Sequence, residues 1–326
     1  MKSMRAIRIH KTGGREVMQL EQLPVPTAQQ LGPKHLLIKN KAIGVNFIDT
    51  YFREGLYKAA LPLTLGKEAA GEVVAVGSEV KDVQEGDRVV YSAVSGAYAE
   101  LTVLDNGMFA KIPQGISEEL AAASFVQGLT AITLVEETYK VKRDDWILVH
   151  AASGGMGGWL VQILVAMGAN VIGTASTQAK LDLAKANGCQ HLINYSSEDV
   201  VQRVKEFVPE GVHCAYDGVG KDTFQISLDC LRRKGTLASF GNASGAVPPI
   251  SILSLTPKNI TLVRPQVFGY LGTPEELKYY TEKLFDHLKR DHIKVAIHKT
   301  YPLEDVQQAH ADLEGRVSTG KLLLKL

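Results

Sequence analysis

Glycines crowd the segment 151–164, AASGGMGGWLVQIL, between two apolar runs. The run before it has the composition of a buried strand, and the run after it has the period of a helix. In a dinucleotide-binding turn, glycines permit a tight strand-to-helix bend and let the backbone approach a pyrophosphate. Ala152, Gly154 and Gly157 occupy the three glycine positions, so the first position departs from the pattern. The amides and the positive dipole end of the helix favour a phosphate there. We expect it to be cradled by Gly154, Gly155, Met156 and Gly157.

The end of the next strand indicates which dinucleotide would bind. An NAD site places an acidic residue about twenty positions after the turn, where it bonds the ribose. The sequence has GTASTQAK over 173–180, with no carboxylate at Ala175 or Ser176. The Ser176 hydroxyl and the Lys180 amine suit a 2'-phosphate instead. The sequence therefore predicts NADPH as the cofactor.

The elements that would position this turn alternate regularly. From Ile147 to Arg264, short apolar runs alternate with helical ones, as in parallel strands joined by crossover helices. We expect a Rossmann-like doubly wound parallel sheet, and an α/β fold class, with that domain over 126–266. Residues 1–125 carry short Val/Ile-rich runs punctuated by Gly, Asp and Pro, which predict an antiparallel, barrel-like domain. The chain is expected to return to that domain over 267–326, ending in the strand GKLLLKL.

Composition excludes several function classes. The 326 residues are 45% hydrophobic and 22% charged, and 36 basic residues nearly cancel 35 acidic ones. No overall field therefore favours nucleic acid or an anionic membrane. The beginning of the chain lacks the apolar core of a signal peptide, and no apolar stretch is long enough to span a bilayer. We expect a cytoplasmic protein with no membrane partner.

Other patterns point to structure more than to chemistry. The three cysteines, Cys189, Cys214 and Cys230, have no CxxC spacing and are expected to be buried. Ser153 lacks the GxSxG order of a hydrolase nucleophile. The basic run LRRKG over 231–235 is interpreted as the end of a helix, where cations complement the dipole, in preference to a nucleic-acid patch.

Several motifs together resemble the zinc-independent quinone oxidoreductase (zeta-crystallin-like, fungal-type) branch of the medium-chain dehydrogenase/reductase superfamily. They are GVNFIDTYFREGLY (44–57), LGKEAAGEVVAVGSEV (65–80), AASGGMG (151–157), DGVGKDTF (217–224), FGNASG (240–245) and STGKLLL (318–324). The resemblance covers nearly the whole chain. It implies a GroES-like β-barrel catalytic domain over 1–125 and 267–326, and a Rossmann-like NADPH-binding domain over 126–266.

The resemblance also bears on metal chemistry. Relatives in the alcohol dehydrogenase branch hold a catalytic zinc with a cysteine near Asn46 and a histidine in a GHE motif, whereas this chain has GKE with Lys67. We therefore expect no metal site. Without a Lewis acid, the reaction suits a substrate that accepts electrons readily, so the resemblance implies an NADPH-dependent quinone reductase. A 2-alkenal or enone reductase is the alternative. AU-rich RNA binding, known among zeta-crystallin-like relatives, is a third possibility.

The resemblance assigns candidate residues as well. Asn46, Ile48 and Tyr51 would line the nicotinamide and substrate side, with Tyr51 the candidate to protonate an oxygen. Ser176, Lys180 and Tyr195 would surround the adenosine phosphate. The remaining candidates for cofactor binding are Thr130, Asn242, Phe268, Tyr270 and Lys321. The alternating edge NITLVRP over 259–265 would be exposed unless it is paired. It predicts a homodimer that extends the Rossmann sheet.

Overall fold

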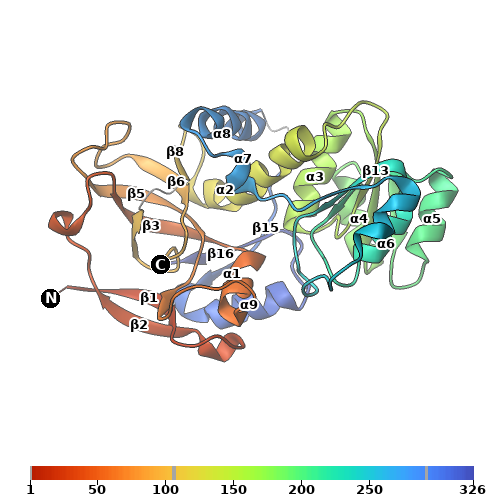
Figure 1. Cartoon of the computed structure of the whole chain (residues 1–326). Coiled ribbons are helices and arrows are strands. Elements are labelled where there is room, and N and C mark those ends of the chain that lie inside the picture. The colour runs from red at the N-terminus through yellow and green to blue at the C-terminus, as the bar shows by residue number, and fades with distance from the viewer. Residues whose placement is uncertain (1, 105–107, 291–292) are drawn as a thin grey trace. The chain divides into compact units, whose positions relative to one another are not determined.

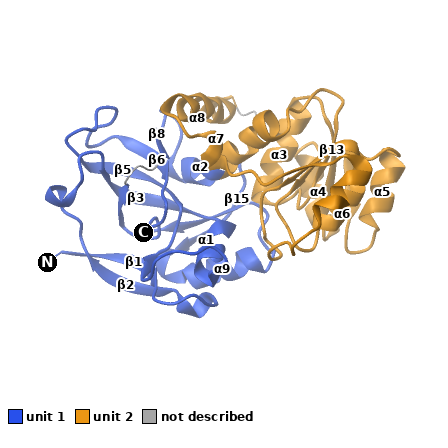
Figure 2. Cartoon of the chain, in the orientation of Figure 1, with its two compact units in different colours: residues 1–126, 295–326 blue, residues 127–294 orange. Residues whose placement is uncertain are grey.

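The chain forms two compact units. The computed structural model describes residues 2–104, 108–290 and 293–326. Unit 1 comprises Met1–Val126 and Val295–Leu326, and unit 2 comprises Gln127–Lys294 (Figure 2). The first boundary lies one residue from the expected 125/126, but the chain returns to unit 1 at residue 295 and not at 267.

Helix α8 (Pro274–Lys289) explains the later return. Its Lys283 Nζ lies 2.7 Å from a Glu136 carboxylate oxygen, and its Tyr280 hydroxyl donates to Glu137 Oε1 at 2.5 Å. Both glutamates belong to unit 2. Helix α8 therefore packs with the second unit, which is why that compact unit extends past the expected boundary at 267.

A parallel sheet forms the centre of unit 2. Its strands are β9 (Trp146–Val149), β10 (Asn170–Ala175), β11 (His191–Asn194), β12 (Val212–Asp217), β13 (Leu231–Ser239) and β14 (Thr261–Val263). They lie in the order β11-β10-β9-β12-β13-β14, and every pairing is parallel. The strand order reverses direction at β9, which is the strand that precedes the glycine-rich turn. This is the doubly wound arrangement that the alternating sequence pattern predicts.

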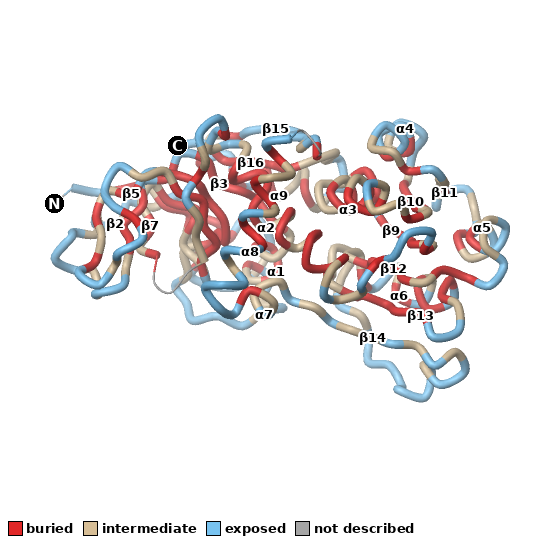
Figure 3. Tube along the Cα trace, turned by 90° about the horizontal axis from the view of Figure 1, so that it is seen from above, coloured by how far each residue is buried: buried red, intermediate tan, exposed pale blue. Residues whose placement is uncertain are grey.

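Helices cover both faces of this sheet (Figure 3). Helices α3 (Gly155–Ala166) and α4 (Gln178–Ala186) pack together, and α5 (Val200–Phe207) and α6 (Phe224–Cys230) pack together on the other face. Strands covered on both faces need apolar side chains throughout, and Leu148, Ile172 and Leu237 are fully buried. The three cysteines are buried and free, as expected.

The basic run at 231–235 differs from its interpretation as a helix end. Helix α6 ends at Cys230, and the run instead begins strand β13. Leu231 is buried and pairs with Val212 of β12, so the chain must leave the helix to reach the sheet. Lys234 then takes a left-handed backbone conformation, with φ at 63°.

Unit 1 is built on a chiefly antiparallel sheet (Figure 1). Its strands, in spatial order, are β15 (Ile297–Pro302), β16 (Lys321–Lys325), β3 (Leu36–Val45), β5 (Glu68–Val76), β6 (Arg88–Ser92) and β8 (Met108–Lys111); β7 (Leu101–Leu104) also pairs with β3. Only the β15–β16 pairing is parallel among the described strands of this sheet. A smaller sheet contains β2 (Gln19–Pro24), β1 (Ser3–Ile9) and β4 (Leu63–Thr64). The last strand of the chain therefore lies beside β3.

Two helices matter for the site in unit 1. Helix α1 (Phe47–Glu54) follows β3, and its N-cap is Asn46. Helix α9 (Val306–Glu314) packs near α1 and against β16. Helix α2 (Glu118–Thr133) carries the chain from the first unit into the second. Over the described part of the chain, no helix has both the length and the apolar character needed to cross a membrane.

Candidate functional site

The turn between β9 and α3 has the tight geometry that a phosphate site requires. Gly154 is the N-cap of α3 and offers no side chain to accept the first amides of the helix, which have no acceptor within the helix. A Cβ on Gly157 would lie 2.2 Å from the Ala151 carbonyl oxygen and 2.7 Å from Ala152 Cα. Only glycine therefore fits there. The amides of Gly155, Met156 and Gly157 are left to bind an anion, so the turn fits a dinucleotide pyrophosphate.

The ends of β10 and β11 bring Ser176 and Tyr195 together. The Tyr195 amide donates to the Ala175 carbonyl at 3.1 Å, and the Ser196 hydroxyl donates to the Ser176 carbonyl at 3.0 Å. The Tyr195 residue is 41% exposed, so its ring presents a face for stacking. Lys180 lies in the first turn of α4, where its amide donates to the capping Thr177 hydroxyl. These three candidate residues occupy the same edge of the sheet.

Asn242 lies in a loop that an arginine holds in place. With its side-chain amide oriented so that both polar groups are paired, Oδ1 accepts from Arg264 Nη2 at 2.9 Å and Nδ2 donates to the Gly241 carbonyl at 3.0 Å. Arg264 Nη1 also donates to the Ser239 carbonyl at 2.9 Å. The Ser244 amide donates to the Val219 carbonyl at 2.8 Å, which joins the FGNASG and DGVG motifs. Sequence reasoning missed Arg264, although the residue lies within the run 259–265 identified as a sheet edge.

Three further candidates of unit 2 lie on two helices. Thr130 is on α2, whereas Phe268 and Tyr270 are on the short helix α7 (Val267–Tyr270). The Tyr270 hydroxyl accepts from Thr138 Oγ1 at 3.0 Å. Sequence reasoning also missed Gln127, whose amide lies so close to the glycine-rich turn that a Cβ on Gly155 would be 2.5 Å from Nε2. No motif marked this glutamine.

In unit 1, a buried ion pair holds Asn46. Lys321 is 1% exposed and Glu68 is fully buried. Lys321 Nζ lies 2.5 Å from Glu68 Oε2 and donates to Asn46 Oδ1 at 2.8 Å. Asn46 Nδ2 donates to the same Glu68 oxygen at 2.9 Å. Lys321 therefore points into unit 1, where it fixes the Asn46 amide.

The glutamate needs space and a further donor. The Val126 amide donates to Glu68 Oε1 at 2.6 Å. A Cβ on Gly44 would lie 2.3 Å from Glu68 Oε2, so the carboxylate fits only beside a glycine. Sequence reasoning missed Glu68, because the GKE motif was used only to identify Lys67. The three buried groups, Asn46, Glu68 and Lys321, are brought together by β3, β5 and β16.

A second buried network of hydrogen bonds begins at helix α1. Asp49 Oδ2 accepts from the Asn46 amide at 2.9 Å and from the Tyr98 hydroxyl at 2.8 Å. The Tyr98 hydroxyl also lies 3.1 Å from His310 Nε2, and His310 Nδ1 lies 3.0 Å from Arg53 Nη1. A neutral imidazole with its proton on Nε2 satisfies both contacts, because arginine can only donate. The Arg53 guanidinium also pairs with Glu314 and Glu54.

Burial decides the charges in this network. It lowers the pKa of His310 to about 3, and the nearby Arg53 and Arg15 cations add to that effect. Burial also raises the pKa of Asp49 to about 6, against the hydrogen bonds from Asn46 and Tyr98. The histidine is therefore neutral at pH 7, and the aspartate titrates close to neutrality.

The other candidates in unit 1 surround helix α1. Tyr51 is buried and packs edge-on against Tyr57, with ring centroids 5.4 Å apart. Ile48 is half-buried on the same helix. Lys67 Nζ lies 4.5 Å from the centroid of the Phe52 ring. Burial lowers the pKa of Lys67, and the Asp49 carboxylate opposes that shift.

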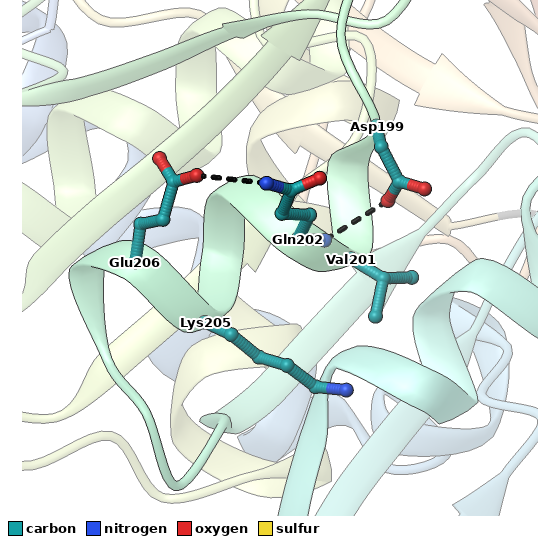
Figure 4. Close-up of a pocket in the computed structure, with 5 residues that line it drawn as sticks. All are labelled: Asp199, Val201, Gln202, Lys205 and Glu206. Atoms are coloured by element: carbon teal, nitrogen blue, oxygen red, sulfur yellow. Dashed lines mark hydrogen bonds between the residues drawn. The ribbon is translucent and has the colours of Figure 1, made fainter.

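The pocket on α5 lies apart from these residues. Among the described residues, no group of three or more His, Cys, Asp or Glu side chains could hold a metal ion. A pocket on α5 is lined by Asp199, Val201, Gln202, Lys205 and Glu206 (Figure 4). Asp199 and Glu206 already bond Gln202 there, and none of the five is a candidate site residue.

Comparisons with known proteins agree on one family. Residues 32–114 match the alcohol dehydrogenase GroES-like domain, and residues 155–286 match the family described as zinc-binding dehydrogenase. A probable quinone oxidoreductase of Schizosaccharomyces pombe is 43% identical over 98% of this chain and 96% of its own length. A 2-haloacrylate reductase of a Burkholderia species is 36% identical, over 97% of each chain.

The solved structures agree as well. The crystal structure of Escherichia coli quinone oxidoreductase complexed with NADPH superimposes with a TM-score of 0.95 and 43% identity, covering 99% of this chain and all of the other. The α/β fold with a Rossmann-like sheet and a GroES-like domain is thus the fold of these relatives. The protein belongs to the quinone oxidoreductase branch of the medium-chain dehydrogenase/reductase superfamily.

Proposed function

We propose that this protein is an NADPH:quinone oxidoreductase. The observation that carries the proposal is a glycine-rich turn whose first helix amides have no capping side chain, together with the next strand, which is followed by Ser176 and Lys180 but has no carboxylate at its end. Relatives named quinone oxidoreductase, at 42–44% identity over nearly the full length, support the substrate class. The NADPH found with the E. coli relative supports the cofactor.

The residues present fit NADPH. Gly154, Gly155, Met156 and Gly157 would hold its pyrophosphate, and Ser176, Lys180 and Tyr195 would hold its adenosine phosphate. The nicotinamide end would lie near Thr130, Asn242, Phe268 and Tyr270. When bound, NADPH supplies a hydride to an electron-poor substrate.

Unit 1 would supply the substrate side. Asn46 is held by Lys321 and Glu68, so its side chain cannot rotate and can orient a bound group without further loss of entropy. In this proposal Lys321 acts on the site through Asn46. Ile48 and the Tyr51 ring would contact the substrate, and burial of Tyr51 excludes water from it.

Cofactor oxidation with a panel of acceptors tests the function. NADPH consumption is measured with an ortho-quinone, a para-quinone and a 2-alkenal, and alcohol oxidation with NADP⁺, all in the presence of EDTA and repeated with NADH and NAD⁺. We expect rapid, NADPH-specific turnover of a quinone that the chelator does not affect. Loss of turnover in EDTA would contradict the zinc-independent mechanism.

An NADPH-dependent 2-alkenal or enone reductase is the second candidate. It is favoured by the 36% identity to a 2-haloacrylate reductase. The same panel decides between the two, since alkenals would react and quinones would not. Binding of AU-rich RNA is tested by competition between NADPH and a labelled RNA. Displacement of the labelled RNA by micromolar NADPH would support a specific RNA site.

We also propose a cytoplasmic homodimer that extends the parallel sheet of unit 2. Strand β14 is the edge of that sheet, and the preceding segment η4 (Ile252–Lys258) exposes Ile252 and Leu253, at 79% and 73%. An open edge next to apolar side chains supports pairing with a second copy. Light scattering coupled to gel filtration should give twice the chain mass. The Leu253→Glu variant should give a measured mass closer to that of the monomer.

A further inference from the structure

An unpaired carboxylate oxygen and a lysine amine lie at one corner of unit 1. Asp49 Oδ1 is buried and has none, although Oδ2 has two. Lys67 is 7% exposed, and no acceptor among the described residues lies within hydrogen-bonding distance of its Nζ. Leaving the buried Asp49 oxygen unpaired costs free energy, so it marks a position where a ligand or proton carrier would be accommodated.

Both groups lie at helix α1, Asp49 on the helix and Lys67 against one of its rings. Asp49 and Phe52 are three residues apart, so their side chains are neighbours on that helix. Lys67 immediately precedes β5 and crosses the Phe52 ring at 4.5 Å. Asp49 and Lys67 influence each other electrostatically, yet no ion pair joins them within 4.0 Å in the described part of the chain. The amine therefore contacts the Phe52 ring of helix α1 and is not held in an ion pair with Asp49.

The surroundings of Lys67 favour release of its proton. The charged groups on the elements around this corner are Asp49 on α1, Glu68 on β5 and Lys321 on β16, and the Tyr98 hydroxyl lies behind Asp49. Lys321 and Glu68 neutralise each other, so Asp49 is the charge that acts most directly on Lys67. Burial of the ammonium outweighs that carboxylate and holds the pKa of Lys67 below its ordinary value.

We propose that Lys67 is the proton donor to the substrate oxygen, and that Asp49 is a positioning residue that tunes it. The inference rests on the proposed function. The quinone or enone would accept a hydride, which is one proton and two electrons, from the reduced nicotinamide, which would be oxidised. The Lys67 Nζ–H bond then breaks as an O–H bond forms on the substrate, which neutralises the anionic oxygen. The neutral amine left behind regains its proton from solvent.

The test compares Lys67→Met, Lys67→Arg and Lys58→Met in the full chain with saturating NADPH. Methionine has a similar shape but no ionisable proton, and arginine keeps the charge but does not release a proton near pH 7. Lys58 is an exposed control on the same segment. We expect both Lys67 variants to lose about 10²–10³-fold in kcat with KM within about threefold, as for loss of a general acid. We expect Lys58→Met to match the wild type.

The pH profile separates proton donation from a structural role. The wild-type kcat should fall at alkaline pH as Lys67 loses its proton, and this limb should be absent in Lys67→Met. In Asp49→Asn the limb should move to lower pH, because the carboxylate that favours the ammonium is gone. Lysine labelled with ¹³C at Cε provides an NMR titration of Lys67 that needs no substrate, and it should give a pKa below the ordinary value and lower still in Asp49→Asn.

The possible failures can be told apart. If the wild type reduces quinones and Lys67→Met does so equally, with the alkaline limb intact, the role of Lys67 is overturned and the proposed function stands. An ordinary pKa for Lys67 by NMR also overturns it. If the wild type reduces neither quinones nor alkenals, the proposed function and this inference both fail.

Discussion

The ammonium group of Lys321 is buried, whereas a lysine near the end of a chain usually keeps its charge in water. Its only anionic partner among the described residues is Glu68, which is itself fully buried. We expect Lys321→Met to cost about 3–5 kcal/mol in the free energy of unfolding, because an unpaired carboxylate remains inside. Urea denaturation measures the loss. Lys325→Met, an exposed change on the same strand, is the control, and equal costs for the two variants would contradict the ion pair.

His310 makes stability depend on pH in a definite direction. Its folded pKa of about 3 lies below the unfolded value of about 6.5, so the unfolded chain binds more protons between these values. Its contribution to stability is therefore present above pH 6.5 and is lost as pH falls toward 3. Asp49 acts oppositely, because its folded pKa of about 6 is raised, and its contribution is lost as pH rises through 6.

Denaturation midpoints between pH 3 and 7 test this sign. We expect His310→Gln to lose less stability on acidification than the wild type does. The matched control is His298→Gln, at an exposed position, which should keep the wild-type slope. A His310→Gln slope as steep as that of the wild type would mean that the buried imidazole does not control the acid limb.

Lys180 is the residue on which the choice of cofactor depends. Lys180→Ala should raise the KM for NADPH about tenfold, since a charge-assisted bond to phosphate is worth about 1–2 kcal/mol. The KM for NADH should change little, because that cofactor has no 2'-phosphate. Steady-state kinetics with both cofactors measure this. Lys185→Ala, an exposed change on the same helix, is the control, and equal losses with NADPH and NADH would contradict phosphate recognition.

At the scale of elements, glycine serves two purposes in the β9–α3 turn: close packing of the backbone at Gly157 and access for the cofactor at Gly154. Gly157→Ala would force a Cβ to within 2.2 Å of the Ala151 carbonyl oxygen, so we expect a loss of several kcal/mol in stability and of cofactor binding. On Gly154 a Cβ meets only the Ala151 oxygen, at 3.3 Å. Gly154→Ala should therefore fold nearly as well but bind NADPH more weakly, because the methyl group obstructs the pyrophosphate. Thermal unfolding and NADPH fluorescence distinguish the two effects, and equal stability losses would refute the distinction.

The elements also show which parts of the molecule the sequence can predict. Regular alternation was sufficient for the parallel sheet and for its edge near residue 261, because buried strands and amphipathic helices have distinct local patterns. The run at 231–235 was predicted wrongly as a helix end. Its structure depends on the pairing of Leu231 with Val212, which is distant in the sequence and leaves no local pattern. The Glu68–Lys321 pair and the Tyr98–His310 contact join residues 253 and 212 positions apart. No spacing in the sequence predicts these pairs, because the residues come together only when distant strands pair.

At the scale of the whole molecule, the discontinuous unit 1 needs both of its segments. Residues 295–326 contribute β16, which pairs with β3, and α9, which carries His310. Without them Glu68 loses its cation, and Arg53 loses both His310 and Glu314. Unit 2 is continuous over 127–294 and contains its own parallel sheet. The two units should therefore differ in whether a single segment can fold.

We expect a fragment of residues 127–294 to unfold cooperatively in urea, whereas a fragment of residues 1–126 should show no cooperative transition. Joining 1–126 to 295–326 through a flexible Gly/Ser linker should restore the transition, because the linker returns β16 and α9 to the same chain at modest entropic cost. Introducing Lys321→Met into the joined fragment should weaken it again. Circular dichroism and amide hydrogen exchange follow these transitions. Cooperative unfolding of 1–126 alone, at the midpoint of the joined fragment, would show that the buried charge of Glu68 does not require the distant lysine for unit 1 to fold.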